Sequence, residues 1–131
     1  MRTLTVLMLL WCLTAGCSGG SDSIVGVTSV DSIEIVILDG FPGQVMIIAR
    51  GGLPDSCSEI GSITQRREGN TFMVTIETLR NPDQICAQVI VPFQESISLD
   101  IEGLPSDKYF VDVNSVRDSF VLDHQSQTGD L

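Results

Sequence analysis

Short segments in which apolar and polar residues alternate recur along this chain, with turn signals between them. Alternation of this kind is typical of half-buried β-strands. The clearest example covers residues 72–77, where one face is formed by Phe72, Val74 and Ile76. Similar segments cover residues 33–38, 45–49, 57–65, 96–101, 109–113 and 116–122. The pattern predicts an all-β fold, namely an antiparallel β-sandwich of about seven strands.

Local irregularities interrupt this pattern at three places. The alternation of residues 57–65 breaks near Gly61, which is consistent with a β-bulge. Residues 87–93 are apolar and fit either a buried strand or a helical turn. Asn114 and Ser115 fit a two-residue hairpin turn, because Asn tolerates positive φ.

The predicted turn sets the pairing of the last two strands. It places Asp112 opposite Arg117, where the two side chains form a surface ion pair. The same register puts Asp118 on the apolar face. Either Asp118 lies at the rim of the sandwich or the register slips by one residue, and we expect the rim.

Met46 and Ile48 make the second face of the strand over residues 45–49 apolar as well. An apolar outer face is either a contact surface for a partner or is covered by another segment. We expect the segment Ile24–Val27 to cover it.

The first seventeen residues have the layout of an export signal. Arg2 precedes an apolar run over residues 4–11, and small residues lead to Cys17. The apolar run is shorter than the roughly 20 residues that cross a bilayer. The segment therefore predicts secretion rather than a membrane-spanning helix.

The end of this segment, Leu13-Thr14-Ala15-Gly16-Cys17, resembles the lipobox of bacterial lipoproteins, although Thr14 occupies a position that is usually aliphatic. The resemblance implies that residues 1–16 are removed and that Cys17 is acylated at the new amino terminus. It implies an extracytoplasmic location, with a lipid anchor in the cell membrane or the outer membrane. The alternative is an ordinary signal peptide that leaves Cys17 as a thiol.

The number of cysteines favours the lipoprotein. The chain has four, and Cys12 leaves with the signal. Exported proteins tend to pair their cysteines, so an odd thiol needs an explanation. Acylation of Cys17 leaves Cys57 and Cys86 as one expected disulfide. A redox-active or metal-binding pair is the alternative, but there is no Cys-x-x-Cys and the only histidine is His124.

Removal of residues 1–16 leaves 115 of the 131 residues, a length that suits one domain. We expect a tether over residues 17–31, the sandwich over 32–123 and a disordered tail over 124–131. Without Arg2 the chain has six basic and seventeen acidic residues, a formal charge of −11. Such a chain repels nucleic acid and anionic lipid headgroups. The expected contact with the membrane is the lipid anchor.

The segment that begins with Gly103-Leu104-Pro105 and continues through residues 109–114 resembles the closing hairpin of Ig-like and prealbumin-like sandwiches on bacterial surface proteins. Asp107 and Ser115 replace glycines of that pattern. The resemblance implies an Ig-like sandwich and says nothing about activity.

No combination of residues in the sequence predicts catalysis. His124, in the expected tail, is a poor general base. There is no phosphate-binding glycine loop, and too few cysteines and histidines for a structural zinc site. The loop residues Asp55, Asp83 and Asp107 have no calcium-site spacing and are expected to be solvated. We therefore expect a protein without catalytic activity or a cofactor.

The expected function is that of a monomeric, membrane-anchored binding or accessory module, for which a protein is a candidate partner. The expected contact residues lie in the loops beside the two cysteines: Leu53, Pro54, Asp55, Asn81, Pro82 and Asp83. The alternative is a proteinaceous inhibitor of a secreted hydrolase, of protease or lysozyme type, which would insert these loops into the enzyme's cleft.

Overall fold

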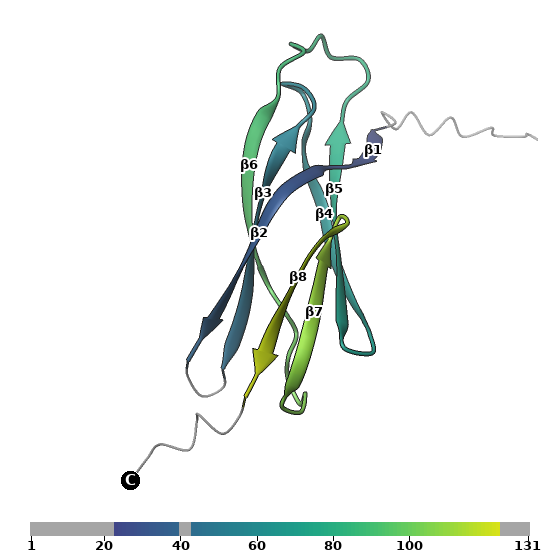
Figure 1. The fold of residues 1–131 in the computed structure, drawn as a ribbon. Helices are drawn as coiled ribbons and strands as arrows, with labels where there is room; N and C mark the ends of the chain where they lie inside the picture. The colour runs from purple at the N-terminus through teal and green to yellow at the C-terminus, as the bar shows by residue number, and fades with distance from the viewer. Residues whose placement is uncertain (1–22, 40–42, 124–131) are drawn as a thin grey trace, which may run out of the picture.

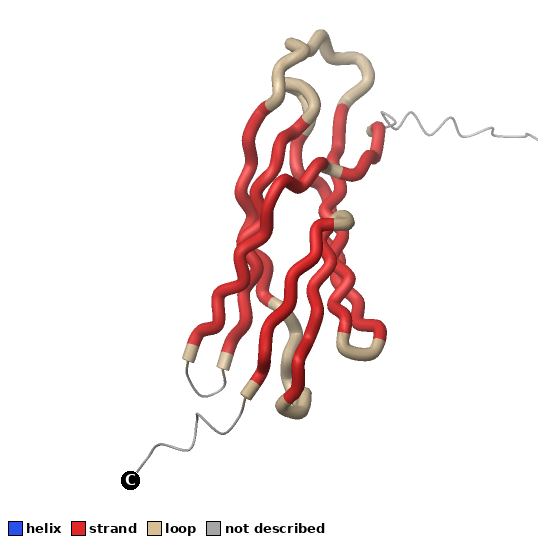
Figure 2. Tube along the Cα trace, viewed as in Figure 1, coloured by secondary structure: helices blue, strands red, loops and turns tan. Residues whose placement is uncertain are grey.

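The computed structural model describes residues 23–39 and 43–123, in which there are eight strands and no helix (Figures 1 and 2). The strands are β1 (Ile24–Val27), β2 (Ser29–Leu38), β3 (Gln44–Leu53), β4 (Glu59–Glu68), β5 (Thr71–Arg80), β6 (Val91–Ser98), β7 (Asp107–Val113) and β8 (Val116–Leu122). Within these ranges no helix is long and apolar enough to cross a membrane. The expected signal (1–16), the expected lipidation site Cys17 and the expected tail (124–131) lie outside the described residues.

The strands form two sheets that face each other across a common core (Figure 1). One sheet has the order β2-β3-β6, with antiparallel neighbours. In the other, β5 pairs with β4 on one side and with β1 and β7 on the other, and β7 pairs with β8. The predicted β-sandwich is confirmed. One pair departs from the antiparallel pattern, because β5 and β7 run parallel.

Residues 24–31, which the sequence pattern places in the tether, form β1 and the beginning of β2. Three of the four β1 residues are exposed apolar side chains, so this strand has no alternation by which it could be recognised. It is held by pairing with β5, in which Ile24 lies opposite Arg80. The chain then changes sheets at Thr28, which is buried and whose N–H donates to the Ile76 carbonyl at 3.2 Å.

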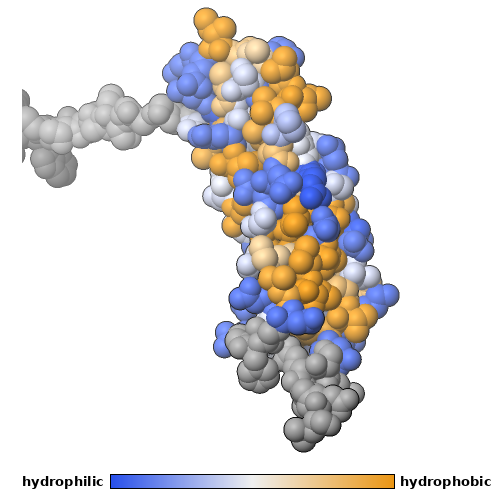
Figure 3. All heavy atoms as spheres, turned by 90° about the vertical axis from the view of Figure 1, so that its left-hand side faces the viewer, coloured by the Kyte–Doolittle hydropathy of each residue, from blue (hydrophilic) through white to orange (hydrophobic). Residues whose placement is uncertain are grey.

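The outer face of the β2-β3-β6 sheet carries an apolar strip made of Val36, Leu38, Met46 and Ile48. The prediction that Ile24–Val27 covers Met46 and Ile48 is wrong, because that segment pairs with β5 in the opposite sheet. Hydrophobic residues accordingly gather along this face in the surface view (Figure 3).

The segment from residue 87 to residue 101 contains one strand, β6, and not two. Residues 85–90 have no regular structure, and the strand begins at Val91. Ile97 and Leu99 are buried, as their alternation predicts. The backbone N–H of Leu99 donates to the Val45 carbonyl at 2.9 Å, which continues the pairing with β3 beyond the end of β6.

The core is formed by apolar side chains from both sheets, including Val45, Ile47, Ala49, Phe72, Val74, Ile76, Ile97, Tyr109, Val111, Val113 and Phe120. Three aromatic rings pack together within it. The ring centroids of Phe72, Tyr109 and Phe120 lie 5.8–6.2 Å apart. The Tyr109 hydroxyl donates to the Pro105 carbonyl at 2.7 Å. Tyrosines that bond to the backbone a few residues upstream recur in Ig-like sandwiches.

Asn114 closes a gap in the five-stranded sheet, at the point on β5 where β1 has ended and β7 has not begun. Its Nδ2 donates to the carbonyls of Thr28 and Ile76 at 2.9 and 3.0 Å. Its Oδ1 accepts from the Ile76 N–H at 2.9 Å. One side chain thus supplies the hydrogen bonds that a strand residue would make there.

The closing hairpin has the predicted turn and register. Asn114 and Ser115 both have positive φ, 47° and 76°, as a type I′ turn requires. Asp112 pairs with Arg117, whose Nε donates to Asp112 Oδ2 at 2.8 Å. The expected surface pair is exposed only on the Arg117 side, because Asp112 is buried. Asp118 lies opposite Val111 without a register slip and is exposed on the edge strand β8, as expected for the rim. The predicted bulge is also present, since the β4 register shifts between Ile60 and Ile63.

Candidate functional site

A disulfide joins two loops at one end of the sandwich, which we call the disulfide end (residues 53–58 and 81–90; top of Figure 1). Cys57 and Cys86 are bonded with Cα atoms 5.5 Å apart. Backbone contacts reinforce the link. The Ser56 N–H donates to the Ala87 carbonyl at 3.1 Å, and the Ala87 N–H donates to the Ser56 Oγ at 2.8 Å. The two loops therefore form one braced unit.

Asp55 organises the first of these loops from a buried position. Its Oδ1 accepts from the N–H groups of Cys57 and Ser58, at 3.0 and 2.8 Å, and from the Ser58 hydroxyl at 2.9 Å. Its Oδ2 lies 3.0 Å from Arg80 Nε. That nitrogen is not well aligned for a hydrogen bond, so the attraction is mainly between charges. Asp55 therefore connects the cysteine loop to the end of β5.

The environment of Asp55 acts on its pKa in two directions. Burial raises the pKa, because it disfavours the charged carboxylate. Hydrogen bonds from the Ser58 hydroxyl and from the Cys57 and Ser58 N–H groups, together with the charge of Arg80, lower it by more. The pKa of Asp55 therefore lies below the ordinary value of an aspartate, and folding favours the ionised carboxylate.

We predict that Asp55→Asn removes an acid-sensitive part of the stability. A group whose pKa is lowered by folding stabilises the protein above its unfolded pKa of about 4, and loses that contribution as the pH falls through the folded value. The wild type should melt at a higher temperature than the variant at pH 6, and the difference should shrink as the pH falls below about 4. Melting curves of both proteins across this range test it. A difference that grows as the pH falls would contradict the assignment.

The structure divides the six expected contact residues into two groups. Pro54, Asn81, Pro82 and Asp83 are exposed. Leu53 and Asp55 are buried, so they support the loops and do not contact a partner. The expectation that Asp55 is solvated is wrong, because Ser58 and Arg80 enclose it.

Three exposed aliphatic side chains at the disulfide end were missed by sequence reasoning. Ile85 is 102% exposed, Ile90 78% and Val89 52%. The composition of residues 87–93 fits either a buried strand or a helical turn, but residues 85–90 have no regular structure and lie outside the core, beside the disulfide. The available signal was their position in sequence, since all three lie within four residues of Cys86, the second cysteine of the disulfide.

A hollow with a volume of about 450 Å³ lies beside this end. It is a shallow, open depression lined by Val27, Ser29, Asp31, Gly52, Leu53, Pro54 and Ile90. A Cβ at Gly52 would lie 2.5 Å from the Ile90 Cγ2, so a larger residue here would displace the exposed Ile90 side chain. Asp31 is the one ionisable residue of its lining, so the depression lacks the pair of convergent groups that acid–base catalysis uses.

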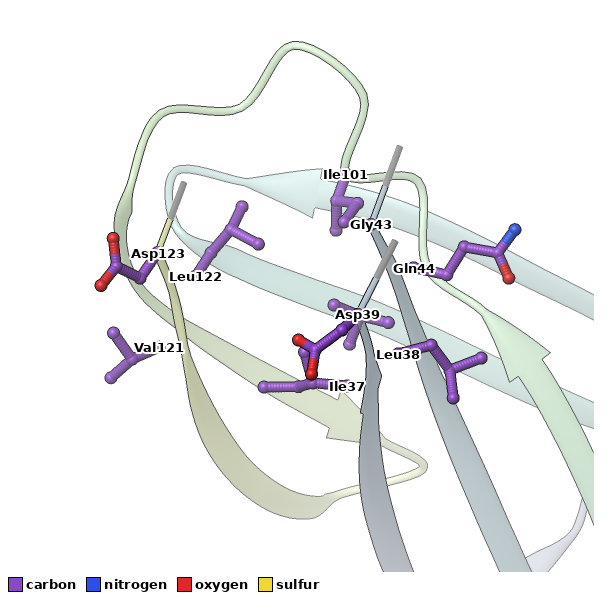
Figure 4. A pocket seen from close by; sticks show the side chains of 10 residues that line it. Ile37, Leu38, Asp39, Gly43, Gln44, Ile101, Val121, Leu122 and Asp123 are labelled. Carbon is purple, nitrogen blue, oxygen red and sulfur yellow. The ribbon is translucent and has the colours of Figure 1, made fainter. Parts of the chain in front are cut away.

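A second hollow of about 90 Å³ lies at the opposite end of the sandwich (Figure 4). Its lining includes Ile37, Leu38, Ile101 and Leu122, with Asp39 and Asp123 nearby. The volume is small beside the roughly 300–1,000 Å³ of typical ligand pockets. Residues 40–42 and 124–131, which adjoin it in sequence, are outside the described part of the chain.

Two sets of residues bear on metal binding: the cluster of Asp55, Cys57 and Cys86, and the loop aspartates Asp55, Asp83 and Asp107. Asp55, Cys57 and Cys86 place ligand atoms within 4.8 Å of one another, but both sulfurs are consumed by the disulfide. Asp107, the third aspartate considered for calcium, lies at the opposite end of the sandwich. There it accepts from Asn70 Nδ2 at 3.0 Å and from the Lys108 N–H at 2.7 Å, which lower its pKa. The three aspartates therefore do not converge.

Comparison with known proteins places most of the described chain in one family. The family model of the ORF11 beta-sandwich domain matches residues 47–122, which include the disulfide-bonded Cys57 and Cys86. An "Uncharacterized 10.2 kDa protein in HgiCIIM 5'region" of Herpetosiphon aurantiacus is 31% identical over 93 residues, 71% of this chain and 98% of its own length. Proteins of the HgiBIM and HgiEIM 5′ regions of the same organism are each 36% identical over 81 residues, 62% of this chain and 98% of their own lengths. No solved structure matches the chain.

Proposed function

Since the chain belongs to the ORF11 beta-sandwich domain family, we propose that it is one such domain exported from the cytoplasm, held on the membrane by a lipid on Cys17 and acting as a non-catalytic binding module. The Cys57–Cys86 bond carries this proposal. Disulfides persist in oxidising compartments outside the cytoplasm and are rare inside it. The bond also leaves Cys17 as the one cysteine of the mature chain without a partner, and acylation accounts for it.

The braced loops support binding as the activity. Crosslinking and hydrogen bonding hold residues 53–58 and 81–90 in one arrangement, so little loop entropy is lost when a partner binds. Exposed residues of both kinds needed for contact are present: polar Asn81 and Asp83, and apolar Ile85 and Ile90. The lack of converging titratable groups around the 450 Å³ depression favours binding over catalysis.

Inhibition of a secreted hydrolase remains the second candidate, and the rigidity of the same loops favours it. Inhibitors of this kind bind tightly because their contact loops are preorganised. Assays of the mature protein against proteases and lysozymes at micromolar concentration separate the two functions. The absence of inhibition in every class would remove this candidate.

The lipid anchor predicts that Cys17→Ser abolishes membrane attachment. Stable anchoring needs more than one acyl chain, and this substitution removes the site at which acylation begins. We expect the variant to be almost absent from the membrane fraction and to incorporate no labelled fatty acid. Cys12→Ser, inside the expected signal, is the matched control and should fractionate as the wild type does. Normal labelling of Cys17→Ser would refute the anchor.

A further inference from the structure

The amino-terminal strand enters the sandwich at the disulfide end. β1 pairs with the last residues of β5, and Ile24 lies opposite Arg80, the residue that precedes the second loop of that end (Figure 1). Seven residue steps separate Cys17 from Ile24. A chain of that length spans at most about 25 Å, whatever its conformation. If Cys17 is acylated, this end of the domain cannot leave the vicinity of the bilayer.

The surface that would face the bilayer presents exposed apolar side chains beside the polar residues Asn81 and Asp83. Ile85, Val89 and Ile90 project from the second loop, and the exposed residues Ile24 and Val25 adjoin it on β1. Hydrophobic residues are visible at this end in the surface view (Figure 3). The positive charge nearest to them in sequence, Arg80, is paired with Asp55. The surface therefore has the chemistry to contact acyl chains and lacks a cluster of cations that would bind anionic headgroups.

We infer that the disulfide end docks on the lipid surface to which the chain is anchored, with Ile85, Val89 and Ile90 entering the interfacial region. This inference rests on the proposed lipid anchor. The anchor supplies a high effective concentration, so a contact too weak to bind a free domain to the membrane is enough to orient a tethered one. The formal charge of −11 predicts that docking is stronger on zwitterionic than on anionic lipid.

Docking in this orientation has a consequence for the rest of the surface. The end with the 90 Å³ hollow and the apolar strip of Val36, Leu38, Met46 and Ile48 remain accessible from the aqueous side. A soluble protein that used the disulfide end would have to displace the bilayer. The membrane is therefore the favoured occupant of this end, and a protein partner is the rival outcome of the test.

Tryptophan fluorescence gives a direct test, because the only tryptophan, Trp11, lies in the expected signal. Ile85→Trp introduces a unique reporter at the disulfide end, and the full exposure of Ile85 makes the substitution compatible with the fold. Val121→Trp, at a position 62% exposed at the opposite end, is the matched control. Both lipidated proteins are bound to phosphatidylcholine vesicles with or without brominated acyl chains. We expect a blue shift and strong bromine quenching for Ile85→Trp, and neither for Val121→Trp.

The outcomes separate the two proposals. Failure of the lipidated protein to float with vesicles would overturn the anchor. Flotation without quenching of Ile85→Trp, or with equal quenching of both reporters, would leave the anchor in place and overturn the docking. A blue shift of the Ile85→Trp fluorescence on addition of a membrane-extracted protein, but not on addition of vesicles, would overturn the docking in favour of a protein partner.

Discussion

Reduction of the Cys57–Cys86 bond should lower the free energy of unfolding of the mature chain by about 3 to 4 kcal/mol. The two cysteines are 29 positions apart, and the bond restricts the unfolded chain by closing that loop. Small domains have only about 5 to 15 kcal/mol of stability in total, so the loss is a large share. For a domain of this size the melting temperature should fall by on the order of 15 to 25 °C.

Thermal denaturation with and without reductant measures this effect. The double variant Cys57→Ser/Cys86→Ser is the control. It should melt near the temperature of the reduced wild type and should not respond to reductant. A midpoint that is the same in both conditions for the wild type would mean that the cysteines are unpaired in the protein. It would also remove the observation on which export depends.

Asn114→Ala should destabilise the fold by about 2 to 4 kcal/mol, the second largest effect that we expect from a local change. The substitution removes three hydrogen bonds in the gap between β1 and β7, and leaves the Ile76 N–H and the Thr28 carbonyl without that partner. It also places alanine at a φ of 47°, in the left-handed region that alanine disfavours. Chemical denaturation of wild type and variant measures the difference.

Two further variants separate the hydrogen bonds from the backbone conformation. Asn114→Gly loses the same bonds but accepts positive φ, so it should be less destabilising than Asn114→Ala. Ser115→Gly keeps the three Asn114 hydrogen bonds and removes a side chain from a backbone φ of 76°, so it should be neutral or stabilising. Equal stability of Asn114→Ala and the wild type would show that the Asn114 hydrogen bonds to Thr28 and Ile76 do not stabilise the sheet.

Features that depend on neighbours in sequence could be predicted. The turn at Asn114–Ser115, the Asp112–Arg117 pair and the bulge near Gly61 follow from φ preferences and strand periodicity, and all three are present. The disulfide follows from counting the cysteines of a chain that is expected to be exported. Local physical chemistry determines the turn, the ion pair and the bulge, and the number of cysteines indicates the disulfide, so none of these predictions requires knowledge of the tertiary fold.

Features that depend on contacts between distant segments could not be predicted. β1 is exposed on most of its surface and is defined by its pairing with β5, which a periodicity cannot reveal. Asp55 has the composition of a solvated turn residue and is buried because Arg80, at the end of another strand, lies beside it. The exposed residues Ile85, Val89 and Ile90 have the composition of a core strand, but they lie outside the core in a loop that the disulfide and the Ser56–Ala87 hydrogen bonds join to the Cys57 loop.

Mass spectrometry of the protein isolated from the membrane fraction tests the central claim, export with acylation of Cys17 and oxidation of the other two cysteines. The account predicts a chain that begins at Cys17, with a mass increased by its acyl groups, and a proteolytic fragment in which the peptides containing Cys57 and Cys86 are linked. A chain that retains residues 1–16 and has free thiols at positions 57 and 86 would contradict it.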